Sequence, residues 1–193
     1  MTTFATKFKA KCREWASPLL NSTVQERKRW LYLTVICSAA AVGAEVWFYD
    51  NYRIAWDRQI LRCLDARFLL VDLKSKPKHV NAIERNKIYA YTSAQSAPII
   101  KDGTLVGKYL RGMPGDTVEI RSDDTVWING RKLAEGMPHL CGMTPKERQK
   151  FYGVRVLKED EYWMMGTKYL SFDSRYWGPI HRSQIVGRAY VLF

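Results

Sequence analysis

Lys108-Tyr-Leu-Arg-Gly-Met-Pro-Gly-Asp-Thr-Val118 is the stretch from which the fold of this chain can be worked out. Its Pro114-Gly115-Asp116 segment is typical of a tight turn, because proline fixes φ and glycine tolerates a left-handed conformation. Apolar and β-branched residues flank the turn, which predicts one strand over residues 104–110 and another over residues 116–120. The stretch therefore predicts a strand, a turn and a second strand.

Similar short runs of β-branched and aromatic residues, separated by turn residues, continue on both sides of this unit. They cover residues 68–71, 88–91, 126–128, 162–165 and 185–192. Asn129-Gly130 predicts a tight hairpin, since both residues tolerate positive φ. Residues 133–152 are expected to form a loop or short helix inserted into the sheet. The predicted fold class is mostly β, with this domain covering residues 50–193.

A different pattern precedes the domain. Residues 31–49 form an apolar run that would span roughly 28 Å as a helix, enough to cross a bilayer. Aromatic residues lie at both of its ends, as they do at membrane interfaces. The alternatives are a buried helix of a soluble protein and, less in keeping with the late start of the run, a cleaved signal peptide.

Charge predicts an orientation for this span. Residues 1–30 form a basic tail, and Arg27, Lys28 and Arg29 lie directly before the apolar run. Positive charge next to a span favours the cytoplasmic side, so the C-terminal domain is expected in the periplasm of a bacterium, anchored in the inner membrane. Lipid is then the first expected partner.

The formal net charge of +12 also raises the question of nucleic-acid binding. The basic residues of the domain are scattered and match no nucleic-acid-binding motif, so this function is not expected. The cysteines, Cys12, Cys37, Cys63 and Cys141, lack C-x-x-C spacing, and His79, His139 and His181 form no metal-site pattern. Neither a cofactor nor a metal is predicted.

The family that the domain resembles is indicated by a second stretch, Gly166-Thr-Lys-Tyr-Leu-Ser-Phe-Asp-Ser-Arg-Tyr-Trp-Gly178. Together with residues 108–118, it resembles two signature boxes of the type I signal peptidases, membrane-anchored serine/lysine proteases that remove leader sequences. A third stretch, residues 84–91, is a degraded match to that family's R-G-D-x-V-x-F strand. The resemblance implies a signal-peptidase-like β domain on a single N-terminal transmembrane helix.

The resemblance also assigns roles. Lys108 corresponds to the general base, and Ser171 to a serine whose hydroxyl orients that lysine. Asp173 and Arg175 match a pair that braces the site, although a purely structural role is the alternative. A lysine acts as a base only when it is neutral, which burial favours. Most lysines in strands point outward, so the strand pattern alone does not predict that burial.

The residue at the position of the nucleophile differs from the serine of the family. Where its serine box would stand, the chain has Gln59-Ile-Leu-Arg-Cys-Leu-Asp65, so Cys63 takes the position of the serine. Leu61 replaces the hydroxyl-bearing residue that such enzymes use in the oxyanion hole. Three interpretations of Cys63 remain open: a nucleophile, since a thiol loses its proton more easily than a hydroxyl; one half of a Cys63–Cys141 disulfide; or a buried, inert residue.

Other hydroxyls fit less well, because Ser75, Ser93 and Ser96 lie among turn residues at the wrong spacing from Lys108. The departure at the serine box resembles the conjugation (TraF-type) branch of the family. That branch implies maturation, and in some members cyclisation, of a pilin for a type IV secretion apparatus. The expected substrate is a prepilin or another leader-bearing protein. The alternative function is a catalytically inactive pseudo-peptidase that serves as an assembly scaffold in the same apparatus.

Overall fold

The computed structural model describes residues 11, 23–57, 62–94 and 96–193. Two compact units make up the chain, residues 1–49 and residues 50–193. Most of the predicted basic tail, residues 1–30, lies outside the described residues, as do Cys12 and Leu61.

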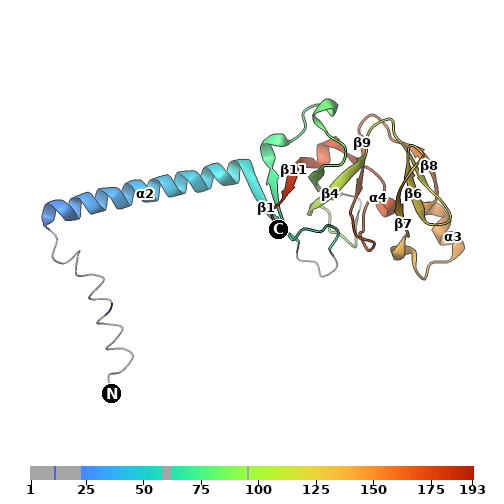
Figure 1. The fold of residues 1–193 in the computed structure, drawn as a ribbon, viewed down its shortest axis with the longest axis horizontal. Helices are drawn as coiled ribbons and strands as arrows, with labels where there is room; N and C mark the ends of the chain where they lie inside the picture. Colours follow the sequence, from blue (N-terminus) through green and yellow to red (C-terminus); the bar gives the residue numbers. More distant parts are fainter. Residues whose placement is uncertain (1–10, 12–22, 58–61, 95) are drawn as a thin grey trace, which may run out of the picture. The chain divides into compact units, whose positions relative to one another are not determined.

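Helix α2, Val24–Asn51, contains the predicted span of residues 31–49 and extends beyond it at both ends (Figure 1). It begins at a capping box: Thr23 Oγ1 accepts a hydrogen bond from the Glu26 backbone, and the Glu26 carboxylate accepts one from Thr23 N at 2.7 Å. No residue of the helix is buried, and its length and apolar composition suit a membrane span.

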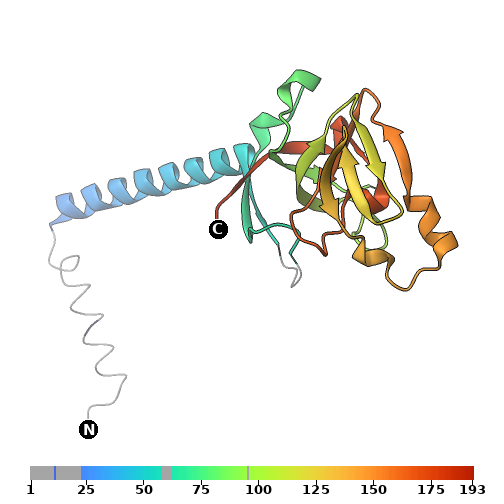
Figure 2. The ribbon, with the colours of Figure 1, turned by 45° about the vertical axis from the view of Figure 1, so that its right-hand side comes forward.

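Residues 50–193 form the β domain, which contains two antiparallel sheets (Figure 2). The larger sheet has seven strands in the order β1-β2-β11-β3-β4-β9-β10. Its strands are β1 Tyr52–Trp56, β2 Phe68–Asp72, β3 Ile88–Thr92, β4 Leu105–Gly112, β9 Glu161–Met165, β10 Ile180–His181 and β11 Ile185–Val191. The smaller sheet has the order β7-β6-β5-β8, from β5 Thr117–Ile120, β6 Thr125–Ile128, β7 Arg131–Glu135 and β8 Gly153–Val156.

The turn between β4 and β5 joins the two sheets, and its chemistry is that predicted from Pro114-Gly115-Asp116. Gly115 has φ +85°, a left-handed conformation that favours glycine. The Asp116 carboxylate accepts hydrogen bonds from Met113 N at 2.7 Å and from the guanidinium of Arg85. Burial opposes the charge of Asp116, but these hydrogen bonds hold its pKa below the usual value.

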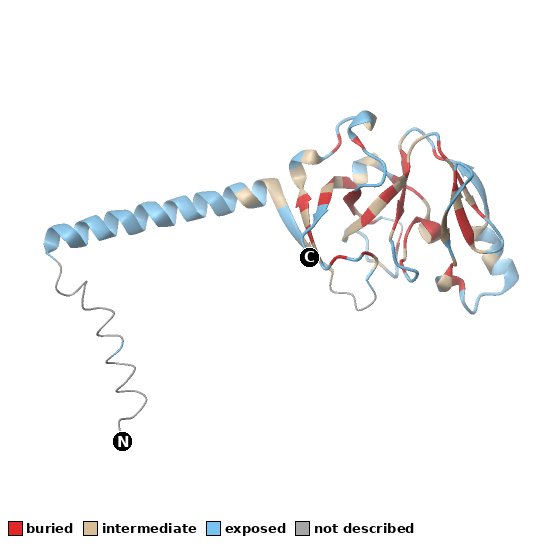
Figure 3. Ribbon diagram, viewed as in Figure 1, coloured by how far each residue is buried: buried red, intermediate tan, exposed pale blue. Residues whose placement is uncertain are grey.

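Hydrophobic side chains pack on both faces of the large sheet, and buried residues concentrate in the strands (Figure 3). Along β3, Tyr89 and Tyr91 point into one cluster and Ile88 and Ala90 into another, because successive side chains of a strand alternate between faces. A third cluster packs beneath the small sheet. The prediction of a mostly β fold is confirmed.

The structure differs from the predicted elements in a few places. Strands β1, β8 and β10 were not predicted; β10 has only two residues, and β1 and β8 are identified by their pairing with β2 and β5. The hairpin at Asn129-Gly130 is present, with φ of 50° and 73°. Its second strand, β7, includes residues 133–135, so the predicted insertion of residues 133–152 begins too early. The remainder holds the short helix α3, Pro145–Arg148, and the 3₁₀ turns Pro138–Leu140 and Gln149–Phe151.

Candidate active site

Lys108 lies inside the β domain, although strand lysines usually point to solvent. It stands on β4 directly opposite Tyr89 of β3, and paired residues share a face of the sheet. That face is the one on which Tyr89 and Leu110 pack, and Lys108 is 0% exposed. Its Nζ donates a hydrogen bond to Ser171 Oγ at 2.8 Å. Among the described residues, no carboxylate forms an ion pair with this amine.

Ser171 lies in the loop that follows β9, and it is also fully buried. Further along this loop, Asp173 caps helix α4, Ser174–Trp177, by accepting from Arg175 N. The Asp173 carboxylate accepts from Arg175 Nε at 2.8 Å, and Arg175 Nη2 also donates to the Ser171 carbonyl at 2.9 Å. The predicted pair is thus a buried ion pair that holds the backbone of Ser171.

Electrostatics favour the charged form of Arg175. Burial works against the positive charge of Arg175, but the hydrogen bond to Asp173 raises its pKa above the ordinary arginine value. Gly166 N donates to the same carboxylate at 3.1 Å. Both ends of the loop between residues 166 and 175 are therefore fixed to Asp173.

Cys63 lies on an irregular segment before β2, and it is half-buried. Its carbonyl oxygen accepts from Thr167 N at 2.9 Å and from Lys168 N at 3.3 Å. Next to it, Leu64 and Ala66 are 4% and 3% exposed and pack in the core. These contacts place the Cys63 backbone against the start of the loop that carries Ser171.

Asp65 adds a second link between the same segments. Its carboxylate forms an ion pair with the Lys168 ammonium and accepts from the Thr167 hydroxyl at 3.3 Å. The hydrogen bond from Lys168 lowers the pKa of Asp65 below its usual value. Both Asp65 and Lys168 are largely exposed, so this link is screened by solvent.

Gly166 is the point at which the two predicted site halves meet, and sequence reasoning did not single it out. A Cβ at Gly166 would lie 2.2 Å from Ser171 Oγ and 2.5 Å from the Cys63 carbonyl oxygen. The separation between Ser171 Oγ and the Cys63 carbonyl oxygen therefore cannot exceed the sum of these two distances. Ser171 Oγ in turn contacts Lys108 Nζ, so residues far apart in sequence share one small region. Gly166 is the first residue of the stretch 166–178 that resembles the second signature box, and this position was the signal that the sequence offered for its importance.

The cysteine interpretations can now be compared with the geometry. Cys63 and Cys141 are both free thiols, so the disulfide is not formed in this structure. The alternative hydroxyls have structural partners: Ser93 Oγ donates to the Lys101 carbonyl at 2.7 Å, and Ser75 Oγ donates to the Asp72 carbonyl at 2.6 Å. The third, Ser96, is buried. The Cys63 carbonyl oxygen lies close to Ser171 Oγ, the hydrogen-bond partner of Lys108.

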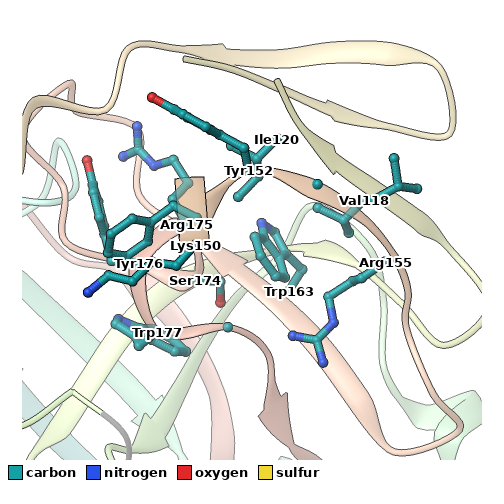
Figure 4. Close-up of a pocket in the computed structure, with 14 residues that line it drawn as sticks. Val118, Ile120, Lys150, Tyr152, Arg155, Trp163, Ser174, Arg175, Tyr176 and Trp177 are labelled. Carbon is teal, nitrogen blue, oxygen red and sulfur yellow. The ribbon is translucent and has the colours of Figure 1, made fainter. Parts of the chain in front are cut away.

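Two of the cavities that the described residues form lie at different places in the domain. The larger, about 440 Å³, is bordered by β5, β8 and α4, with Trp163, Trp177, Lys150 and Arg155 on its walls (Figure 4). Neither Cys63 nor Lys108 lines it. The smaller, about 350 Å³, is lined by Gly166 to Tyr169 and by Arg175. The smaller cavity therefore adjoins the loop that is hydrogen-bonded to Cys63 and that carries Ser171. Among the described residues, no three His, Cys, Asp or Glu side chains group as a metal site.

The chain was compared with known proteins. A family model described as signal peptidase, peptidase S26, matches residues 27–193. A signal peptidase I from Leptolyngbya laminosa is 31% identical over 92% of this chain and 83% of that protein. A signal peptidase I from Bacillus amyloliquefaciens is 38% identical over 85% of this chain and 83% of that protein.

Other matches are shorter. The probable signal peptidase I-2 of Synechocystis sp. is 33% identical over 57% of this chain and 48% of that protein, so the chain spans about half of that relative's length. A solved signal peptidase I from Enterococcus faecalis is 29% identical, covers 57% of this chain and 97% of that chain, and has a TM-score of 0.34. The family model covers most of the sequence and both predicted boxes, and the chain therefore belongs to the signal peptidase, peptidase S26 family.

Proposed function

We propose that this protein is a membrane-anchored endopeptidase that removes leader segments from exported proteins, with Cys63 as nucleophile and Lys108 as general base. The observation that carries the proposal is the buried hydrogen bond between Lys108 Nζ and Ser171 Oγ, next to the backbone of Cys63. An amine without a carboxylate partner in a water-poor site is suited to proton transfer.

The proposed reaction begins when the Lys108 amine takes the proton of the Cys63 thiol. Donation of one N–H to Ser171 fixes the direction of the amine lone pair, which is the role proposed for that serine. The sulfur attacks the scissile carbonyl, a tetrahedral intermediate forms, and the leaving amine departs with a proton from the Lys108 ammonium. A thioester remains, and water then releases the leader.

Asp173 and Arg175 support this chemistry without taking part in it. Their ion pair fixes the Ser171 carbonyl and the Gly166 amide, and therefore fixes the hydroxyl that contacts Lys108. The cavity of about 350 Å³ beside residues 166–169 gives room for a substrate segment at this loop. The proposed substrate is an extended segment with small side chains near the cut, bound by addition to a sheet edge.

Helix α2 is the proposed membrane anchor. Its length fits a bilayer, and Arg27, Lys28 and Arg29 in its first turns favour a cytoplasmic N-terminus. The β domain would then face the periplasm from a bacterial inner membrane. Within this function, the pilin precursor of a conjugative type IV secretion apparatus is the proposed substrate. The departure from the serine box at Cys63 supports that assignment, and ring closure would require an amine in place of water at the thioester.

The test is cleavage of a synthetic leader peptide by the full chain in detergent or liposomes. Cys63→Ala should abolish cleavage, and Cys63→Ser should restore a small part of it, because a hydroxyl is a weaker nucleophile at neutral pH. Cys141→Ala is the matched control, since Cys141 is an exposed free thiol, and it should cleave like the parent.

Thiol alkylation sharpens the same test. Iodoacetamide should inactivate the parent and the Cys141→Ala variant at the same rate. If Cys63→Ala processes the peptide as fast as the parent, Cys63 is not the nucleophile. If the parent binds the peptide without cleaving it, the protein is the inactive scaffold.

A further inference from the structure

The cavity of about 350 Å³ beside residues 166–169 has a surplus of positive charge. Four charged side chains line it: Arg111, Glu135, Lys168 and Arg175. Three of them have a partner of opposite charge, in the pairs Lys168–Asp65, Arg175–Asp173 and Glu135–Lys132. None of the ion pairs among the described residues involves Arg111. Its positive charge is therefore the one that the described walls of the cavity leave uncompensated.

A bulge in strand β4 positions Arg111 at this cavity. Leu110 and Gly112 of β4 pair with consecutive residues of β9, Met164 and Trp163. Arg111 therefore has no partner on β9. An extra residue of this kind bends the strand and re-aims a side chain, and such bulges are frequent beside active sites. Strand β4 thus carries the proposed base and, three residues later, an arginine that lines the cavity.

The Arg111 guanidinium is held in place but only partly used. Its Nη1 donates a hydrogen bond to Asn86 Oδ1 at 2.7 Å, and its central carbon lies 4.7 Å from the centroid of the Tyr109 ring. A guanidinium carries five N–H donors in a planar fork, and the described side chains accept from Nη1 alone. The side chain is half-buried and not closed off, so the other donors remain for a ligand.

Burial makes a counterion for this group favourable. Partial removal of water disfavours the charged form and lowers the pKa of Arg111 below the usual arginine value. An arginine in a protein nevertheless keeps its proton at neutral pH, so the positive charge stays. A carboxylate matches the planar fork of a guanidinium and would replace the hydration that this charge has lost.

The cavity is open to solvent and adjoins the proposed nucleophile. Thr167, Lys168 and Tyr169 on its wall are exposed. Gly166 is on the same wall, and a Cβ there would lie 2.5 Å from the Cys63 carbonyl oxygen. An extended peptide advances about 3.3 Å per residue. A peptide bound at Cys63 therefore has residues near its scissile bond within reach of the cavity.

We propose that this cavity receives an acidic side chain of the substrate, close to the scissile bond, and that Arg111 binds its carboxylate through charge-assisted hydrogen bonds. The proposal rests on the proposed function and narrows its substrate class. The substrate is a leader-bearing protein with an aspartate or glutamate within a few residues of the cut. Arg111 is then a specificity-determining residue that takes no part in the bond-breaking chemistry.

The test begins with the parent protein, as the full chain in detergent. Synthetic leader peptides carry a single glutamate at each position in turn, from the third residue before the cut to the third after it. Matched peptides carry glutamine there. At one position, kcat/KM should be about tenfold higher for the glutamate peptide, as expected for hydrogen bonds to a charged group. A scan in which every position differs by less than about twofold overturns the proposal.

Substitution of Arg111 identifies the group that recognises the charge. In Arg111→Gln, the ratio of kcat/KM for the two peptides should fall to about one, and in Arg111→Glu a lysine peptide should become the better substrate. A ratio compares two substrates on one variant, so a partial loss of folded protein cancels from it. Arg111→Lys keeps the charge without the planar fork and should retain part of the preference. A glutamate preference that survives in Arg111→Gln overturns the proposal.

Arg131→Gln is the matched control, because Arg131 is exposed and does not line the cavity. It removes the same charge from the domain and should keep the parent ratio. An equal fall in both variants would mean that the net charge of the protein attracts the acidic peptide, and the proposal would fail. If the parent cleaves in a Cys63-dependent manner without a preference for glutamate, the proposed function stands and this inference falls. If the parent cleaves none of the peptides, both fall.

Discussion

Lys108 and Cys63 are the two residues to which the proposed reaction assigns proton transfer and attack, and the domain holds them in different ways. Lys108 stands in the middle of a strand, fully buried, with its amine fixed by Ser171 and that serine backed by the buried Asp173–Arg175 pair. Cys63 lies on an irregular segment, half-buried, held by two backbone hydrogen bonds and an exposed ion pair. The proposed base is part of the core, whereas the proposed nucleophile lies on a segment that is attached to the core.

This difference predicts where substitutions act. Changes on the Lys108 side should alter chemistry or the stability of the whole domain, because they disturb buried groups. Changes on the Cys63 side should alter the placement of one segment and leave global stability largely intact. Four substitutions test the comparison, from the largest expected effect to the smallest.

Lys108→Met should give the largest effect. The substitution keeps an unbranched side chain in a buried position but removes the base, so kcat should fall by about 10²–10⁴-fold. The melting temperature should not fall, because the variant no longer buries an amine. Peptide cleavage and thermal unfolding are the measurements. Lys101→Met, at an exposed position, is the control and should behave as the parent. A Lys108→Met variant with parent activity would remove the base from the proposed mechanism.

Arg175→Met should cost the most stability. It leaves the Asp173 carboxylate buried without its partner, and loss of one member of a buried pair costs about 3–5 kcal/mol in the free energy of unfolding. Urea denaturation of the full chain in detergent measures this. The control is Arg188→Met, which breaks the more exposed pair with Glu84 and should cost less than about 1 kcal/mol. Equal losses in both variants would show that the Asp173–Arg175 pair does not support the fold.

Gly166→Ala tests the contact between the two halves. The added methyl group would overlap Ser171 Oγ and the Cys63 carbonyl oxygen, so both must shift. Displacement of reacting groups by about 1 Å costs roughly 10²-fold in rate, which is the expected fall in kcat. Gly43→Ala is the control, since no atom lies within 4 Å of a Cβ there. Unchanged cleavage by Gly166→Ala would mean that the two segments tolerate separation.

Asp65→Asn should have the smallest effect. It weakens the exposed ion pair with Lys168, and cleavage should fall by less than about tenfold. The folded-state pKa of Asp65 is lowered, so the stabilisation is fully present above the ordinary aspartate pKa of about 4. It is lost as the pH falls through the lowered pKa. The difference in melting temperature between parent and variant should therefore be present at pH 7 and vanish in acid. A difference that persists at low pH would contradict the assignment.

The sequence predicted the side of the site that is built on regular structure. The Pro114-Gly115-Asp116 turn and the Asn129-Gly130 hairpin follow from local backbone preferences, and both are present. The contact of Lys108 with Ser171 was expected from a family resemblance and not from the strand pattern. Because side chains alternate along a strand, Lys108 could lie on either face of the sheet. Its pairing with Tyr89 of the neighbouring strand β3 shows that it lies on the buried face.

The parts that the sequence did not predict depend on long-range contacts. The backbone hydrogen bonds from Thr167 and Lys168 to Cys63 join residues about a hundred positions apart and involve groups that every residue carries. Strand β8 was overlooked for a similar reason: its four exposed residues are identified by pairing with β5.

The two hydrogen bonds to the Cys63 carbonyl have one further consequence. They come from residues 167 and 168, a few positions before the serine that holds Lys108. A displacement of this loop would thus carry the sulfur and the serine hydroxyl in the same direction, so most of it would cancel in the distance between them. The distance between Cys63 and Ser171 changes only when the two segments that carry them move relative to each other. Lys108 lies on strand β4 outside this loop, so its distance from the Cys63 sulfur would change with a displacement of the loop.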